Sequence, residues 1–141
     1  MNYAEWFEAH ALKHKKIVEK LLVKKYGKEG IIDYFDFDNM RINEPDFCPL
    51  YAKNVKCHDM ERLNCYLCAC PEFRFNDKGL EKKDGKTVYS NCAVKSKNGK
   101  ELIFKDAIHQ DCSDCILPHT GTYIEKHFDT DWSRIMKRCR L

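Results

Sequence analysis

The first 26 residues have the hydrophobic spacing of an amphipathic helix. Apolar side chains recur at intervals of three and four residues, at Tyr3, Trp6, Phe7, Ala11, Ile17, Val18, Leu21 and Leu22. This period places them on one helix face. Asn2 followed by Glu5 has the spacing of a capping box, which satisfies free N–H groups where a helix begins. Gly27 suits a helix end, so the pattern predicts a helix over residues 2–26.

The opposite face of this helix is basic, with Lys13, Lys15, Lys16, Lys20, Lys24 and Lys25. A solvated face is the ordinary interpretation, and a contact surface for an acidic protein partner is the alternative. Residues 31–46 are acidic and aromatic, which suits a short helix and a loop whose acids lie against the lysines. We therefore expect residues 1–46 to form an N-terminal helix and an acidic connector.

The middle of the chain has the composition of strands. Residues 87–89 and 102–104 are β-branched, aromatic or apolar, as strand residues tend to be. Asn98-Gly99 lies between them and supplies the pair of positive φ angles that a type I′ turn needs. The pattern predicts a β-hairpin across this turn.

A second helical stripe ends the chain, with Ile124, Phe128, Trp132, Ile135, Met136 and Cys139. Thr122 and Glu125 repeat the capping-box spacing. The basic Lys137, Arg138 and Arg140 suit the C-terminus of a helix. Cys139 lies in this stripe and is expected to be packed rather than bound to a metal.

Nine cysteines in 141 residues are the main chemical signal. No run approaches 18 uncharged apolar residues, as a transmembrane helix requires, and the first residues lack the pattern of a signal peptide. We therefore expect a cytoplasmic protein, in which structural disulfides do not persist. Metal ligation becomes the leading interpretation of the cysteines.

Two pairs of cysteines have the Cys-x-x-Cys spacing, Cys65/Cys68 and Cys112/Cys115. A two-residue gap lets one tight turn direct two sulfurs at one ion. The other thiols before residue 116 are Cys48, Cys57, Cys70 and Cys92. Eight thiolates suffice for two four-thiolate centres. Cys65, Cys68 and Cys70 are too close in sequence to serve one ion with relaxed turns, so Cys68 and Cys70 are expected to serve different centres.

The histidines divide into two kinds. His58 and His119 adjoin the thiol motifs, and an imidazole can replace a thiolate at zinc, so both are candidate ligands. His10 and His14 lie four residues apart on the predicted first helix, with no third ligand near them in sequence. We expect these two at the surface or in an interface.

Several chemistries fit these thiols. Zinc accepts mixed Cys/His ligands and suits paired turns, so two zinc ions are the favoured cofactors. An iron–sulfur cluster is the alternative, since Cys48-Pro49 and Cys70-Pro71 have a pairing found in bacterial ferredoxins. A thiol–disulfide couple at a Cys-x-x-Cys pair and a set of inert core thiols are also open.

The formal charge of +3 counts every thiol as neutral, whereas metal-bound cysteines are thiolates. Eight thiolates on two divalent ions would turn the net charge negative. The pI therefore gives no indication of nucleic-acid binding.

The order of these motifs resembles a known family. Cys57-His58, the run from Asn64 to Pro71, the isolated Cys92 and the run from Asp111 to His119 are similar to the cysteine-rich small domain family of bacteria and archaea. That family is described as zinc-finger-like and as a probable metal-binding domain. The resemblance covers about residues 48–125 and implies metal binding by the matched cysteines. The charged insert before Cys92 departs from it.

The sequence as a whole predicts an α+β fold. We expect a small metal-centred, cysteine-rich core with a β-hairpin, flanked by N-terminal and C-terminal helices, with the cysteine-rich domain over residues 47–141. Filled four-thiolate sites leave no open position for a substrate. The predicted function is a structural or interaction module with two zinc centres, and an iron–sulfur protein in electron transfer or catalysis is the alternative.

Overall fold

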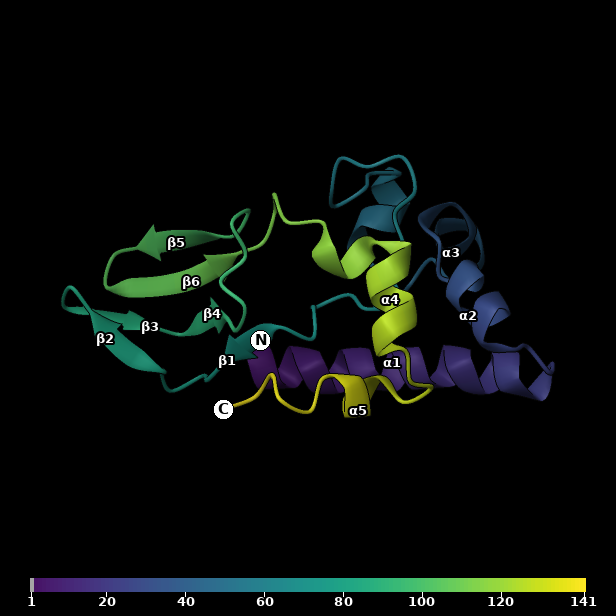
Figure 1. The fold of residues 1–141 in the computed structure, drawn as a ribbon, viewed down its shortest axis with the longest axis horizontal. Helices are drawn as coiled ribbons and strands as arrows, with labels where there is room; N and C mark the ends of the chain where they lie inside the picture. Colours follow the sequence, from purple (N-terminus) through teal and green to yellow (C-terminus); the bar gives the residue numbers. More distant parts are fainter. Residues whose placement is uncertain (1) are drawn as a thin grey trace.

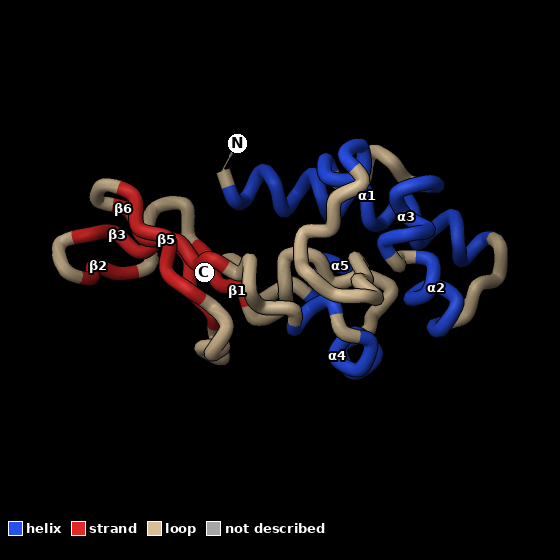
Figure 2. Tube along the Cα trace, turned by 90° about the horizontal axis from the view of Figure 1, so that it is seen from above, coloured by secondary structure: helices blue, strands red, loops and turns tan. Residues whose placement is uncertain are grey.

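Helices and strands gather at opposite ends of the molecule. The computed structural model describes residues 2–141, and Figures 1 and 2 show the strands at one end and most of the helices at the other. The helices are α1 (Tyr3–Val23), α2 (Lys28–Tyr34), α3 (Phe37–Asn43), α4 (Gly121–His127) and α5 (Trp132–Ile135), with short 3-10 turns η1 (Pro49–Lys53) and η2 (Leu117–His119). The predicted α+β class, with helices near both termini, is confirmed.

Two small sheets form the other end. Four strands lie in the order β2-β3-β6-β5, and a separate pair joins β1 to β4. Their bounds are β1 (Phe73–Phe75), β2 (Glu81–Lys83), β3 (Lys86–Val88), β4 (Ser90–Cys92), β5 (Lys100–Phe104) and β6 (Ala107–Asp111). The β1–β4 pair sets Cys92 opposite Phe73, so it fixes Cys92 close to the segment that follows Cys70.

The predicted hairpin across Asn98-Gly99 is wrong, because residues 102–104 pair with the strand that follows them. β5 runs antiparallel to β6, with Phe104 opposite Ala107. A two-residue connection joins these strands, and its Lys105 has a φ of 56°. Residues 93–99 form the loop between β4 and β5.

A second hairpin joins β2 to β3 across Asp84 and Gly85. Both residues have positive φ, 52° and 76°, as a type I′ turn requires. β3 also runs parallel to β6, with Val88 opposite Ile108. Asp84-Gly85 therefore forms a hairpin turn, whereas Asn98-Gly99 does not.

α1 spans much of the molecule's length (Figure 1). Its predicted capping box is confirmed, since Asn2 Oδ1 accepts the N–H of Glu5 at 2.8 Å and the Glu5 carboxylate accepts the N–H of Asn2 at 3.1 Å. The predicted stop at Gly27 is wrong. The helix ends at Val23 with Lys25 in the left-handed region, φ 64°, while Gly27 is the N-cap of α2. In the described residues 2–141, no helix is both long and apolar enough to cross a membrane.

The C-terminal stripe is two helices rather than one. Thr120, and not Thr122, is the N-cap of α4, and its side chain makes no capping hydrogen bond. The chain leaves the helix at Phe128 and re-enters one at Trp132. The capping box predicted from Thr122 and Glu125 is therefore wrong. Cys139 is fully buried, with its S–H directed at the carbonyls of Cys70 and Pro71. The prediction that Cys139 is packed is confirmed.

One hydrophobic core joins the N-terminal helices to the cysteine-bearing loops. It includes Leu21 of α1, Phe35 after α2, Tyr66 between the cysteines and Ile124 of α4, each 0% exposed. Burying a side chain of this size contributes about 1.5–3 kcal/mol. The acidic connector also reaches the lysine face, where Lys20 pairs with Glu44.

His10 and His14 lie in this core, 5% and 0% exposed, so the prediction of surface histidines is wrong. His10 stacks on Trp6 with ring centroids 4.6 Å apart, and His14 stacks on Phe35 at 4.7 Å. His14 Nε2–H donates to the Tyr66 carbonyl at 3.0 Å. Neutral imidazole rings on α1 therefore serve as aromatic core side chains.

These buried histidines predict a loss of stability in acid. Burial lowers the pKa of His10 to about 3 and that of His14 to about 4, whereas in the unfolded chain their pKa is about 6.5. Below that pH the unfolded chain binds more protons, so each histidine costs about 1.4 kcal/mol of unfolding free energy per pH unit. Full stability is present above pH about 6.5 and declines toward pH 4. His10→Phe should remove one histidine's contribution to the pH dependence of the unfolding free energy.

The measurement is urea unfolding of the two proteins at about pH 7.5 and about pH 5. The half-buried His127 supplies a control, because His127→Phe removes an imidazole outside the core. This control should keep the parent's pH dependence. An unchanged slope in His10→Phe would contradict the assignment.

Candidate metal centre

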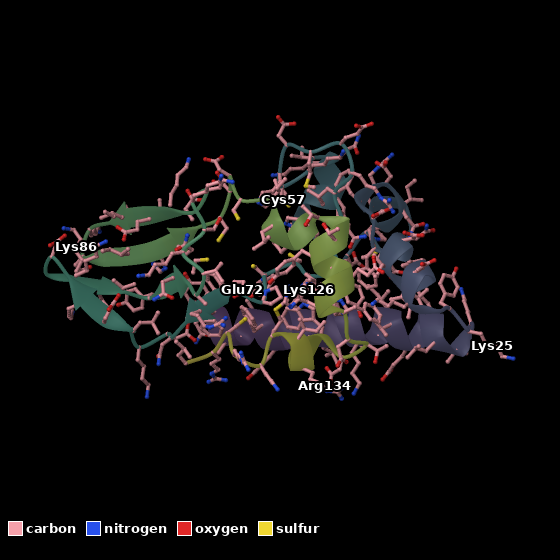
Figure 3. All side chains as sticks on the ribbon, viewed as in Figure 1. Lys25, Cys57, Glu72, Lys86, Lys126 and Arg134 are labelled. Carbon is pink, nitrogen blue, oxygen red and sulfur yellow. The ribbon has the colours of Figure 1, made fainter. Side chains whose placement is uncertain are left out.

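Cys57, His58 and His119 form a compact ligand group. One ligand atom from each lies within 4.8 Å of the others. Cys57 Sγ is 3.0 Å from His58 Nδ1 and 3.8 Å from His119 Nε2. Cys57 and His58 come from the loop after η1 and His119 from the end of η2, so the fold joins segments about sixty residues apart (Figure 3). This group could bind a metal ion.

Hydrogen bonds fix the tautomer of both imidazoles. His58 Nε2–H donates to the Cys112 carbonyl at 2.8 Å, and His119 Nδ1–H donates to the Asn64 carbonyl at 2.8 Å. A carbonyl only accepts, so in the metal-binding form of each ring the remaining nitrogen is the one that offers a lone pair, and that nitrogen faces Cys57 Sγ. Metal-binding histidines have this arrangement, with the second ring nitrogen held by a carbonyl or carboxylate.

The His119 ring also remains neutral. Burial lowers its pKa, the hydrogen bond to the Asn64 carbonyl opposes this, and the nearby His58 adds to the lowering. Neutral imidazole is the form that binds a metal. The neutral His119 ring therefore offers a nitrogen lone pair beside the Cys57 thiol.

Three further thiols, which we call the inner thiols, lie behind this group. They are Cys48, Cys65 and Cys68, which line a cavity of about 310 Å³ together with Cys57 and His119. Burial raises the pKa of Cys65 to about 12, the nearby Tyr51 hydroxyl opposes the rise, and the neighbouring Cys57 and Cys48 add to it. Thiols that raise one another's pKa in this way need a cation to become thiolates together.

The remaining four thiols, which we call the sheet-side thiols, are Cys70, Cys92, Cys112 and Cys115. All four line a larger cavity of about 960 Å³. Burial raises the pKa of Cys112 to about 11, and neighbouring Cys115 and Cys92 raise it further. Ser96 binds two of them, since its N–H donates to Cys92 Sγ at 3.5 Å and its Oγ lies 3.2 Å from Cys115 Sγ.

A left-handed turn separates the two sets. Ala69 and Cys70 have φ of 86° and 56°, a conformation that side chains other than glycine rarely adopt. It reverses the chain just after Cys68. Cys68 lines both cavities, whereas Cys70 lines only the larger one. The division expected between Cys68 and Cys70, like the metal ligands themselves, stays a prediction.

The three sets differ in spacing. Sulfurs bound to one tetrahedral zinc lie about 3.8 Å apart. Among residues 2–141, the Cys57, His58 and His119 group is the one set of three or more His, Cys, Asp or Glu side chains whose ligand atoms all lie within 4.8 Å. The inner and sheet-side thiols are gathered at wider spacing.

Three contributors to the site were missed in the sequence. Tyr51 is 5% exposed, and its buried hydroxyl has no hydrogen-bond partner of good geometry although it lies close enough to Cys65 to affect the pKa of that thiol. Ser96 and Asn64 act through contacts across long loops. Asn64 alone had a signal, because it precedes the Cys-x-x-Cys pair and its backbone carbonyl holds His119.

Comparisons with known proteins found no matching family model, no matching curated protein and no matching solved structure. The resemblance to the cysteine-rich small domain family therefore stays a prediction.

Ligand substitutions give a direct test of the compact group. We expect His58→Ala or His119→Ala to weaken zinc binding by at least about tenfold, because each removes an oriented nitrogen ligand. Competition with a chromophoric chelator measures the affinity. Cys139→Ala is the matched control, since Cys139 is buried away from the group and hydrogen-bonds to carbonyls. Equal zinc affinity in the histidine variants and this control would remove the group from consideration.

Proposed function

We propose that the protein is a cytoplasmic metal-binding protein with two thiolate-containing centres, zinc being the favoured metal. The observation that carries the proposal is the orientation of two imidazoles. His58 Nδ1 and His119 Nε2 both face Cys57 Sγ, and a backbone carbonyl holds the other nitrogen of each ring. A mixed set of one sulfur and two nitrogens suits zinc.

In this proposal the first centre has three protein ligands. No further His, Cys, Asp or Glu among residues 2–141 joins Cys57, His58 and His119 within 4.8 Å. All three residues line the larger cavity, so a fourth position would open onto it. Three ligands with an open position are typical of zinc that binds an exogenous molecule, whereas closed four-ligand sites are structural.

The second centre would be a structural one. The sheet-side thiols come from different parts of the fold, with Cys70 before β1, Cys92 at the end of β4, and Cys112 and Cys115 after β6. A metal held by these four would fasten the strands to the segment that carries Cys70. Ser96, which contacts Cys92 and Cys115, would orient two of the sulfurs.

An iron–sulfur protein is the second candidate, and the wide thiol spacing favours it. A cluster places its own iron and sulfide between the cysteine sulfurs, so it needs four thiolates further apart than one zinc does. Cys57 with the inner thiols makes one such set, and the sheet-side thiols make another. Tyr51 supports thiolates in the first set, because its buried hydroxyl would gain an acceptor there.

Metal analysis of protein purified without air decides between these candidates. We expect a colourless protein that carries zinc. After replacement of zinc by Co²⁺, the thiolate charge-transfer absorption should show one centre with a single sulfur and one centre with four. A brown protein with bound iron and inorganic sulfide would favour the second candidate, and protein without any bound metal would overturn both.

Tyr51→Phe tests whether the inner thiols are ionised in the metal-loaded protein. If Cys65 is a thiolate, the variant loses a hydrogen bond to a charged acceptor and about 1.5–3 kcal/mol of unfolding free energy. If the inner thiols are neutral, removing an unsatisfied buried hydroxyl should instead stabilise the protein. Denaturant unfolding of loaded protein measures the sign. The exposed Tyr26 offers a matched control, since Tyr26→Phe should change little.

A further inference from the structure

The larger cavity has the size of a small-molecule site. Its volume is about 960 Å³, against about 300–1,000 Å³ for typical ligand pockets. Its walls come from both ends of the molecule, since α1 and η2 line it together with strands β1, β4 and β6. The thiols and histidines of the proposed centres form only part of this lining.

Aromatic rings form another part of the lining, and their planes are fixed. The rings are Tyr3, Trp6, Phe7, Phe73 and Tyr89. Trp6 is 37% exposed, yet its ring is held by stacking on His10. Tyr89 stacks on His109 with centroids 5.3 Å apart and an interplanar angle of 17°. Rigid aromatic walls favour a flat ligand, which can stack on them without ordering mobile side chains.

A chain of hydrogen bonds ends at the cavity in His109. Ser90 Oγ accepts the N–H of Gln110 at 2.7 Å and lies 3.1 Å from the Tyr3 hydroxyl. The Tyr3 hydroxyl is 2.6 Å from His109 Nδ1. We assign the Tyr3 O–H as the donor to Nδ1, which places the ring hydrogen of His109 on Nε2. His109 lines the cavity, so it presents one N–H donor to a ligand.

The side chains of the lining disfavour anions. Among the described residues that line the cavity there is no lysine or arginine. Asp77 is already engaged, because its carboxylate accepts the N–H groups of Tyr3 and Ala4 at 2.8 and 3.1 Å. Metal-bound thiolates would add negative charge to the opposite wall. Away from the open position of the first centre, a phosphate or carboxylate would therefore have no cationic partner in this cavity.

We infer that this cavity binds a planar, uncharged bicyclic heteroaromatic molecule, whose carbonyl oxygen accepts a hydrogen bond from His109 while its ring stacks on the aromatic wall. The inference rests on the proposed function in one respect, because the metal centres complete the opposite wall. Tyr3 acts as a positioning residue, since it fixes the tautomer of His109 without contacting the ligand's carbonyl.

Coumarin is a suitable probe because it is planar and neutral and has one carbonyl acceptor. Coumarin-3-carboxylate is its anionic counterpart. We expect saturable binding of coumarin to zinc-loaded protein by calorimetry. In the His58→Ala variant, where the zinc of the first centre is weakened, we expect the carboxylate to bind at least about tenfold more weakly than coumarin. Tyr3→Phe, which keeps the ring, should lower the affinity for coumarin about threefold to tenfold. The ¹⁵N NMR signals of His109 should also shift to the other tautomer. Tyr26→Phe, away from the cavity, should change neither.

Zinc content is measured on the same sample, which separates the two ideas. Zinc-loaded protein that fails to bind coumarin, or a His58→Ala variant that binds both probes equally, overturns the inference and leaves the proposed function standing. Coumarin binding by protein that carries no zinc overturns the proposed function and supports the cavity. If Tyr3→Phe is unstable, His109→Gln tests the same donor, and unchanged coumarin affinity in that variant overturns the role of His109.

Discussion

A single buried imidazole holds the loop from which two of the inner thiols, Cys65 and Cys68, arise. His14 Nε2–H donates to the Tyr66 carbonyl, midway between Cys65 and Cys68. The same ring lies 4.6 Å from the Tyr66 ring and 4.7 Å from that of Phe35. A carbonyl buried without a donor would cost about 1–3 kcal/mol of unfolding free energy. This hydrogen bond therefore holds the loop against α1. The direction of both cysteine side chains depends on it.

The C-terminal segment completes the support of this loop. Trp132 Nε1–H donates to the Cys68 carbonyl at 3.3 Å, and Cys139 directs its S–H at the carbonyls of Cys70 and Pro71. Segments from both ends of the chain thus satisfy backbone carbonyls of one short run of cysteines. Because these backbone carbonyls already accept hydrogen bonds, the cysteine sulfurs are the main groups of the loop that remain free to bind a ligand. This arrangement suits a preformed ligand loop.

Local patterns in the sequence predicted the parts of the fold that local physics decides. The capping box of Asn2 and Glu5 needs only a three-residue spacing, and it is present. Asn98-Gly99 had an equally good local signal, but β5 pairs with β6 instead, because the two-residue turn at Lys105-Asp106 forms a competing hairpin with the strand that follows. The Asp84-Gly85 turn had the same type of signal and was overlooked.

In the candidate site too, some features follow from local sequence patterns and others depend on contacts between distant segments. The spacing of cysteines identified Cys57, His58 and His119 as candidates, since adjacency to thiol motifs is a local property. The nitrogen that each histidine presents depends on carbonyls of Asn64 and Cys112, far away in sequence. The burial of His10 and His14 had no signal either, because an imidazole in an amphipathic stripe resembles a polar interruption until its aromatic neighbours are known.

The reversal at Ala69 and Cys70 links the two thiol sets thermodynamically. Cys68 and Cys70 are separated by one residue, and two left-handed residues hold them apart, a conformation that costs on the order of 1–3 kcal/mol each. A ligand that fixed Cys68 would favour this turn, and the turn places Cys70 in the lining of the larger cavity. Binding on the inner side would then offset part of the ordering entropy of Cys70, so the two cavities would be positively coupled through the short segment from Cys68 to Cys70.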